Sequence, residues 1–201
     1  MRFLLTQSLL SSWQYAIKDT PYSDGGEDPW SDFLATLRNE IRPASDAMLK
    51  GIAFESSVNQ YIANGSIPEP PFEDAVRRFG DICRGGIPQY AASAEETVNG
   101  VPLLLYGRLD YLKAGTIFDI KCSSHYDKGK YFDSPQHPMY LHLVPEATEF
   151  CYLISNGSTT WEERYRRDEV TDILPRISDF LSWLDAVGLM DEYRQNWKAK
   201  E

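Results

Sequence analysis

Two aspartates flank a short turn, and their spacing points to metal-assisted chemistry. Residues 106–113 and 116–122 are apolar-rich runs on either side of Ala114-Gly115, which is the pattern of a β-hairpin with a two-residue loop. Residues that face each other across this loop have numbers that sum to 229. Asp110 and Asp119 are therefore predicted to be direct cross-strand neighbours, with Cβ atoms roughly 5 Å apart.

A divalent cation would offset the repulsion between two opposed carboxylates, which otherwise destabilise a sheet. Hard oxygen ligands at this spacing suit Mg²⁺ or Mn²⁺. Lys121 lies two residues beyond Asp119 and is expected on the same face, where its ammonium could help deprotonate a water or stabilise a charged transition state. Phe118 and Ile120 should point the other way, into a core. The alternative is an exposed hairpin face with solvated charges.

A third carboxylate is predicted on a helix over residues 44–63. Glu55 falls there among apolar residues that recur at steps of three or four: Met48, Ile52, Val58 and Ile62. A carboxylate within a buried stripe is unfavourable unless a partner satisfies it, so a helix packed on the metal side would supply another acidic ligand. The alternative is an edge position at which Glu55 reaches solvent.

A short helix predicted over 134–144 carries two further polar residues. Gln136 and Tyr140 are four residues apart, so they share one helix face and could orient a phosphate or a water. An ordinary amphipathic pair is the alternative. The histidines lack the spacing of a metal triad and are expected at the surface or in loops: His125, His137 and His142.

Composition bounds the class of protein. A chain of 201 residues with 42% hydrophobic content fits one domain over 1–201, with a core at about 44–166 and helical additions over 1–43 and 167–201. A net charge of −10 argues against nucleic-acid binding by bulk electrostatics, although a locally positive cleft with bound metal stays possible. Basic clusters occur at Arg77-Arg78 with Arg84, Lys128 with Lys130, and Arg164 with Arg166-Arg167, each of which is more often a solvated face.

Cysteine usage and hydropathy predict the compartment. The three cysteines are far apart and include no CxxC spacing, so neither a zinc site nor a cysteine-ligated cluster is indicated. Reduced, mostly buried thiols in a cytoplasmic protein are expected. No apolar run approaches the roughly 20 residues that span a bilayer, and the apolar start of the chain is too short for a signal peptide.

The order of elements predicts a mixed α/β fold. Helices are expected over 6–17, 30–41, 44–63, 72–83, 134–144, 170–187 and 190–200, and strands over 89–98, 101–113, 116–122, 149–155 and 159–166. Loops are expected over 21–29 and, rich in lysine, over 123–133. The segment between strands 116–122 and 149–155 is long enough for a crossover that makes them parallel, in a sheet with helices on both faces.

Three motifs in order resemble those of the PD-(D/E)XK nuclease superfamily, in its RecB-like and lambda-exonuclease-like branch. They are Gly107-Arg108-Leu109-Asp110 (GxxD), Asp119-Ile120-Lys121 ((D/E)xK) and Gln136-His137-Pro138-Met139-Tyr140 (QxxxY). Glu55 fits the place of the acidic residue that often precedes them on a helix. The resemblance spans roughly residues 51–155 and implies a restriction-endonuclease-like mixed β-sheet core flanked by helices, with extra N- and C-terminal helices.

The resemblance also implies a reaction. The chain would be a Mg²⁺- or Mn²⁺-dependent deoxyribonuclease, of exonuclease type, that hydrolyses DNA phosphodiester bonds with a metal-activated water. Metal ligands would be Glu55, Asp110, Asp119 and the Ile120 carbonyl, with Lys121 positioning or activating the water and Gln136 and Tyr140 steadying the site or the DNA strand. The iron–sulfur cluster of some relatives is not expected, because its four cysteines are lacking.

Partners and alternatives follow from the same reading. The partner would be single- or double-stranded DNA, a homo-oligomer is possible, and no membrane association is expected. A phage or mobile-element origin would suit a nuclease of this size. One alternative is a catalytically inactive module of the same fold that binds DNA or a protein. A weaker alternative is a metal-dependent hydrolase that acts on a small phosphorylated molecule. The exposed lysine-rich loop over 123–133 suits a polymer substrate better than a small molecule in a closed pocket.

Overall fold

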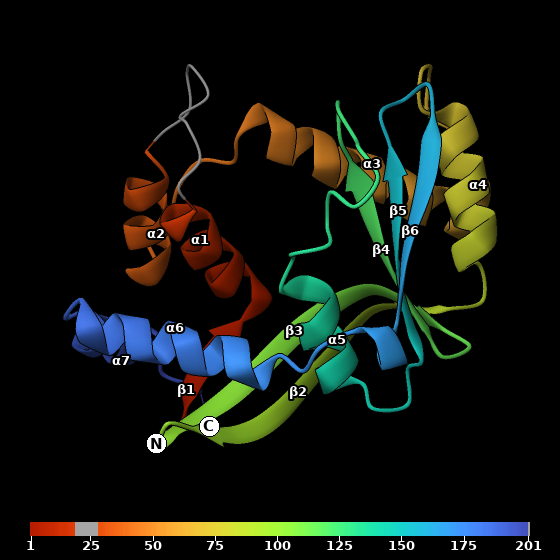
Figure 1. Ribbon diagram of the computed structural model, residues 1–201. Coiled ribbons are helices and arrows are strands. Elements are labelled where there is room, and N and C mark those ends of the chain that lie inside the picture. The colour runs from red at the N-terminus through yellow and green to blue at the C-terminus, as the bar shows by residue number, and fades with distance from the viewer. Residues whose placement is uncertain (19–27, 201) are drawn as a thin grey trace.

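The computed structural model describes residues 1–18 and 28–200, so the loop predicted over 21–29 lies almost wholly outside the described residues. The strands of the described part are β1 (Phe3–Thr6), β2 (Ile87–Val98), β3 (Val101–Lys113), β4 (Thr116–Cys122), β5 (Glu149–Ser155) and β6 (Thr160–Arg166). Its α-helices are α1 (Gln7–Ile17), α2 (Pro29–Leu37), α3 (Asp46–Asn64), α4 (Glu73–Cys83), α5 (Gln136–Leu143), α6 (Leu174–Ala186) and α7 (Met190–Asn196). Figure 1 shows their arrangement.

The strands form one open, mostly antiparallel sheet in the order β1-β3-β4-β5-β6, with β2 paired to the other edge of β3. Strands β4 and β5 are parallel and α5 lies in the connection between them, which confirms the predicted crossover. Strand β1 was not predicted. It is only four residues long, and it lies parallel to β3, with Phe3 beside Leu103. Its last residue, Thr6, caps α1 by accepting a hydrogen bond from the Leu9 amide.

Two hairpin turns set the register of the sheet. Asn99 and Gly100 have φ angles of 51° and 73°, and Ala114 and Gly115 have φ angles of 49° and 80°. Positive φ at both central residues matches the twist of antiparallel strands, so both turns join their strands directly. The hairpin predicted around Ala114-Gly115 is thereby confirmed, and the strands predicted over 89–98 and 101–113 form a second hairpin.

Helices cover both faces of the sheet, as predicted. Alternate residues of β5 divide between two cores, because successive side chains of a strand point to opposite faces. Phe150 and Tyr152 belong to the larger core with α1, α5 and α6, whereas Cys151 and Leu153 belong to a smaller core with α3 and α4. Phe118 and Ile120 are buried in the smaller core, which confirms that they point away from the Asp119 side.

The apolar stripe predicted on the third helix is wrong in its first half. Met48 and Ile52 are exposed, while Phe54 and Val58 are buried. The reason is visible in Figure 1, where α3 begins well away from the sheet and reaches it only with its later turns. Glu55 therefore lies at the point where the helix meets the sheet, half-buried rather than inside a stripe.

Two helix boundaries differ from those predicted. Helix α2 ends at Leu37 rather than residue 41, and α6 begins at Leu174 after a short 3₁₀ turn, Arg167–Glu169.

All three cysteines are free, with Cys83 and Cys151 buried and Cys122 half-buried, as expected. In the described part of the chain, no helix is both long and apolar enough to cross a membrane.

Candidate active site

Strands β3 and β4 separate close to their turn, and the candidate site lies in the fork. The pairs next to the turn keep the predicted register as far as Tyr111 and Phe118. The next pair, Asp110 with Asp119, does not join the ladder, so the prediction of direct cross-strand pairing is wrong in this detail. Asp110 Oδ2 instead accepts a hydrogen bond from the Ile120 amide at 2.7 Å, so a side-chain oxygen takes the place of a strand carbonyl.

A bend in β3 produces this fork. Leu109 packs in the larger core and Tyr111 in the smaller one, although residues two apart in a regular strand share a face. The same point is irregular on β2. Gln89 stands opposite Asp110 in the β2–β3 register, is skipped by the ladder, and has a φ of 49°. The bend turns Asp110 towards the open side of the fork.

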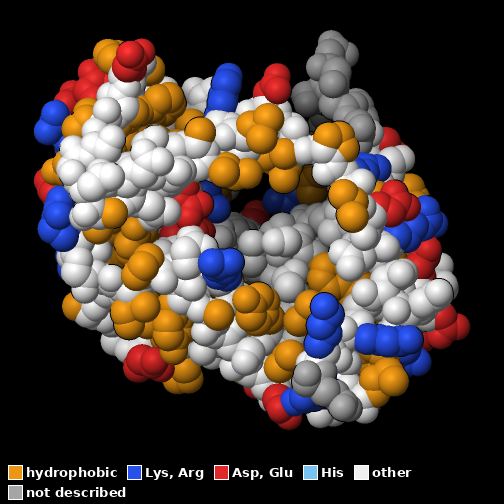
Figure 2. All heavy atoms as spheres, turned by 180° about the vertical axis from the view of Figure 1, so that it is seen from behind, with side chains coloured by type: hydrophobic (Ala, Val, Ile, Leu, Met, Phe, Trp, Pro, Cys, Tyr) orange, Lys and Arg blue, Asp and Glu red, His pale blue; other side chains and the backbone are white. Residues whose placement is uncertain are grey.

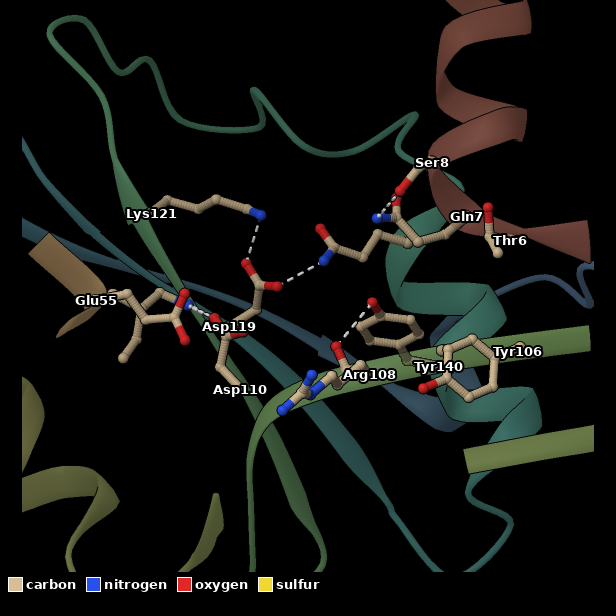
Figure 3. Close-up of a pocket in the computed structure, with 13 residues that line it drawn as sticks. Thr6, Gln7, Ser8, Glu55, Tyr106, Arg108, Asp110, Asp119, Lys121 and Tyr140 are labelled. Carbon is tan, nitrogen blue, oxygen red and sulfur yellow. Dashed lines mark hydrogen bonds and ion pairs between the residues drawn. The ribbon is translucent and has the colours of Figure 1, made fainter. Parts of the chain in front are cut away.

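A pocket of about 390 Å³ occupies the fork and is called the acidic pocket below. Its lining comes from the first turn of α1 and from α3, β3, β4 and α5: Thr6, Gln7, Ser8, Glu55, Tyr106, Gly107, Arg108, Asp110, Asp119, Ile120, Lys121, Gln136 and Tyr140. Every residue that the sequence predicted for the site is in this set. Figure 3 shows the acidic side chains facing the start of α1 across the pocket, and Figure 2 shows the back face of the molecule hollowed near its centre.

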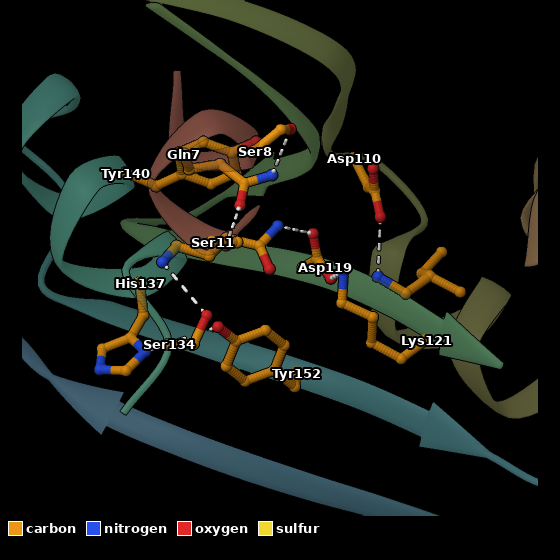
Figure 4. Close-up of polar contacts among 12 residues, drawn as sticks. Gln7, Ser8, Ser11, Asp110, Asp119, Lys121, Ser134, His137, Tyr140 and Tyr152 are labelled. Atoms are coloured by element: carbon orange, nitrogen blue, oxygen red, sulfur yellow. Dashed lines mark hydrogen bonds and ion pairs between the residues drawn. The ribbon is translucent and has the colours of Figure 1, made fainter. Parts of the chain in front are cut away.

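Asp119 is the most buried acidic group of the pocket, with 3% of its surface exposed. Its Oδ1 accepts a hydrogen bond of 2.5 Å from Gln136 Nε2, and its Oδ2 forms an ion pair of 2.7 Å with Lys121 Nζ (Figure 4). Lys121 is the only partner of Oδ2 among the described residues. Burial alone would lower the pKa of Lys121, but the negative charges of Asp119 and Asp110 outweigh it and raise the pKa.

The GxxD and QxxxY segments are packed directly against each other. Gly107 has no side chain, and a Cβ at this position would lie 2.5 Å from the ring of Tyr140. The Tyr140 hydroxyl donates a hydrogen bond of 3.1 Å to the Arg108 carbonyl. This close contact fixes α5 against β3 and so brings Gln136 to Asp119. Gln136 and Tyr140 share the helix face that was predicted, and both are buried.

Glu55 and Asp110 complete the negative charge of the pocket. Glu55 Oε1 accepts a hydrogen bond of 2.7 Å from Gln89 Nε2. Burial, followed by the charge of Asp119, raises the pKa of Glu55. Burial, then Asp119 and then Glu55, raise the pKa of Asp110 well above its usual value. The three carboxylates are therefore close enough to repel one another.

The donor set fits a hard divalent cation in chemistry. Among the described residues, no group of three His, Cys, Asp or Glu side chains is gathered as closely as a bound metal requires. Three carboxylates nevertheless surround one pocket, and Lys121 is the only described partner of a buried Asp119 oxygen. Carboxylate oxygens are the ligands that Mg²⁺ and Mn²⁺ prefer. Glu55, Asp110 and Asp119 are thus the residues that could hold such an ion.

Sequence reasoning missed several residues of the pocket. Tyr106 and Arg108 lie four and two residues before Asp110 on β3, so they share its face, and both are exposed. Their alternation with buried neighbours was a usable signal. Gln89 does not line the pocket but contacts Glu55, and it could also have been found, because 89 and 110 sum to 199, the constant of the Asn99-Gly100 hairpin. The contribution of Gln7 and Ser8 had no signal in the residues alone.

Other candidates have structural explanations. His137 was expected at the surface, but it is buried with its ring stacked on Tyr165, 3.9 Å between centroids, because α5 packs its whole circumference in the interior. His125 is exposed, as expected. Two of the basic clusters are partly neutralised, since Arg78 and Arg164 both pair with Glu162.

No protein-family model matches the chain, and no curated protein does. The structure is similar to a solved structure titled "Crystal structure of SSO0001", with a TM-score of 0.53 and 15% sequence identity. The likeness covers 92% of this chain and 78% of that one. Likeness at this level of identity shows a shared fold.

Proposed function

We propose that this chain is a metal-dependent deoxyribonuclease of the PD-(D/E)XK superfamily, with a restriction-endonuclease-like core and exonuclease-type action. The observation that carries the proposal is the convergence of three carboxylates and one lysine on the acidic pocket, where Lys121 is the only described partner of a buried Asp119 oxygen. The order of the GxxD, (D/E)xK and QxxxY motifs supports it, because the three segments contact one another there.

The residues divide the chemistry between them. Bound Mg²⁺ or Mn²⁺ would lower the pKa of a coordinated water and neutralise charge on the scissile phosphate. Glu55, Asp110 and Asp119 would hold the ion, with the Ile120 carbonyl as a further ligand. Without a bound ion, the charges of Asp119 and Asp110 raise the pKa of Lys121. An ion held by the same carboxylates would weaken this effect, and Lys121 would then position or activate the attacking water.

Gln136 has a positioning role in this proposal. Its amide holds Asp119 Oδ1, which fixes the carboxylate with Oδ2 towards Lys121 and the pocket. Tyr140 supports the same geometry by holding the backbone of Arg108. Neither residue needs to contact the reacting phosphate to influence the rate.

The substrate side of the pocket favours a phosphodiester. Arg108 lines the pocket, is exposed, and forms no ion pair with any described residue. Its guanidinium is suited to a phosphate oxygen, and the exposed ring of Tyr106 beside it can stack on a base. A local cation of this kind allows DNA binding in a chain whose net charge is −10.

The test is a cleavage assay on linear and circular, single- and double-stranded DNA with Mg²⁺, Mn²⁺ or EDTA. We expect end-dependent cleavage with either metal and none with EDTA. Lys121→Ala should reduce the rate by about 100-fold or more, because it removes a charge that stabilises the transition state. Lys198→Ala, an exposed lysine outside the pocket, is the control and should cleave normally. Undiminished cleavage by Lys121→Ala would refute the assigned role.

A catalytically inactive module that binds DNA or a protein is the second candidate. The observation that favours it is the absence, within the described residues, of three ligating side chains already gathered for a metal. It predicts DNA retention in a gel-shift assay with no cleavage under any metal. The same panel of substrates therefore separates the two candidates.

A further inference from the structure

Gln89 has an unusual backbone conformation for its place in the fold. Four non-glycine residues in the described chain have positive φ: Asn39, Gln89, Asn99 and Ala114. Asn99 and Ala114 lie in hairpin turns and Asn39 follows the end of α2, whereas Gln89 lies inside β2. Residues with a side chain avoid this conformation unless their surroundings impose it, and such residues cluster at functional sites.

The conformation places the Gln89 side chain on Glu55. Gln89 faces Asp110 in the register, at the bend that opens the fork, and its Nε2 donates a hydrogen bond of 2.7 Å to Glu55 Oε1. Tyr111 donates a hydrogen bond to Asn59 Oδ1, one turn beyond Glu55 on α3. The hydrogen bond from Gln89 thus holds one oxygen of the Glu55 carboxylate.

We propose that Gln89 is a positioning residue that holds Glu55 so that its carboxylate faces the cation bound by Asp110 and Asp119. The inference rests on the proposed function of the pocket. Groups that hydrogen-bond to metal ligands fix their orientation, and their loss typically weakens metal binding 10- to 100-fold. Gln89 accordingly has a backbone conformation that costs stability and a side chain that strengthens metal binding.

The test measures Mn²⁺ binding to the full chain by electron paramagnetic resonance of the free ion, together with melting temperature in EDTA. Gln89→Gly should bind Mn²⁺ about 10-fold more weakly yet melt at a higher temperature, because glycine accepts positive φ. Ala114→Gly is the matched control: it removes the same backbone strain outside the pocket, so it should raise the melting temperature and leave the Mn²⁺ Kd unchanged.

A double-mutant cycle shows whether Gln89 acts through Glu55. Glu55→Gln should weaken Mn²⁺ binding by about 10-fold or more, and adding Gln89→Gly to it should cause little further loss. Gln89→Asn tolerates positive φ but is one methylene too short for Glu55, so it should reproduce the weaker binding. It serves as the second variant if Gln89→Gly does not fold.

The outcomes separate two failures. If the wild-type chain does not bind Mn²⁺, or if Glu55→Gln binds it normally, the proposed metal site is wrong. If both behave as expected but Gln89→Gly or Gln89→Asn binds Mn²⁺ like the wild type, the role of Gln89 alone is overturned. A fully additive double variant would also overturn it, because Gln89 would then act elsewhere.

Discussion

Two buried carboxylates lie in one row of the sheet, on either side of Tyr152. Asp119 of β4 pairs with Tyr152 of β5, and Tyr152 pairs with Glu163 of β6. Both acidic residues are almost fully buried, at 3% and 8% exposure. Because paired residues of neighbouring strands point to the same face, the two carboxylates share nearly the same depth and surroundings. Their hydrogen-bond partners are nevertheless very different.

Glu163 is satisfied by neutral donors. Its Oε2 accepts a hydrogen bond of 2.6 Å from the Tyr126 hydroxyl, and its Oε1 accepts hydrogen bonds from the Tyr131 amide at 3.1 Å and from the Tyr165 hydroxyl. These contacts attach the loop after β4 to β6. A carboxylate whose lone pairs are occupied in this way stabilises the fold.

Asp119 is surrounded by charge instead. It has one amide donor, Gln136, and one cation, Lys121, and it faces two further carboxylates across an open pocket. Lys121 is the described cation beside Asp119, and in the proposed function a bound metal ion would be a second one. The comparison supports a structural role for Glu163 and, within the proposed function, a chemical role for Asp119.

The largest effect is expected when the charge of Asp119 is removed. Asp119→Asn keeps the size of the side chain but removes a metal ligand and the partner of Lys121, so Mg²⁺-dependent DNA cleavage should fall on the order of a thousandfold or more. Circular dichroism should show an unchanged fold. Cleavage within a few-fold of wild type would place Asp119 in the same structural class as Glu163.

The reciprocal change at Glu163 should act on stability. Glu163→Ala leaves the donors of Tyr126, Tyr131 and Tyr165 without an acceptor, which should lower the free energy of unfolding by about 2 kcal/mol or more. Urea unfolding measures the loss. The variant should still bind Mn²⁺ at low temperature with the affinity of wild type. Weaker Mn²⁺ binding without lost stability would reverse the comparison.

Acid sensitivity is expected on the Glu163 side of the row. Burial, reinforced by the charge of Arg176, lowers the pKa of His137 from 6.5 to about 4. The folded state therefore binds this proton less readily than the unfolded state, and stability is lost as pH falls from about 6.5 towards 4. The contribution is up to about 3 kcal/mol.

His137→Phe tests this assignment. Phenylalanine keeps a ring that can stack on Tyr165 but cannot be protonated, so the variant should lose less stability than wild type between pH 6.5 and pH 4. Urea unfolding at several pH values measures the difference. An identical pH dependence in both proteins would show that other groups cause the acid sensitivity.

A smaller effect is expected at Asp110. Asp110→Asn retains an oxygen for the Ile120 amide but removes one of three mutually repelling charges. The variant should therefore be more stable than wild type in EDTA, by up to about 1 kcal/mol, and should lose this advantage when Mn²⁺ is added. A lower melting temperature in EDTA would contradict mutual repulsion in the pocket.

Local signals in the sequence predicted local geometry well. The Asn99-Gly100 and Ala114-Gly115 turns, the register next to them and the parallel pairing of β4 with β5 were all predictable, because turn residues and connection length determine them. The predicted site residues do line the acidic pocket, whereas Tyr106, Arg108 and the start of α1 were missed.

Features that depend on packing between distant segments were not predictable. The divergence of β3 and β4 at Asp110 depends on the bend shared with Gln89, and the burial of His137 depends on α5 being enclosed on all sides. The exposure of Met48 and Ile52 follows from where α3 crosses the edge of the sheet. Periodicity alone assigns such residues to a core, because it carries no information about how far a helix extends beyond its sheet.

The most direct measurement is an anomalous difference map from crystals soaked in MnCl₂. The account predicts a peak in the acidic pocket, within roughly 2.5 Å of carboxylate oxygens of Asp110 and Asp119, with Glu55 turned towards it. It also predicts no peak beside Glu163. A pocket without manganese at a concentration that saturates other sites, or with Lys121 still paired to Asp119 and the ion bound elsewhere, would contradict the claim that these carboxylates hold a cation.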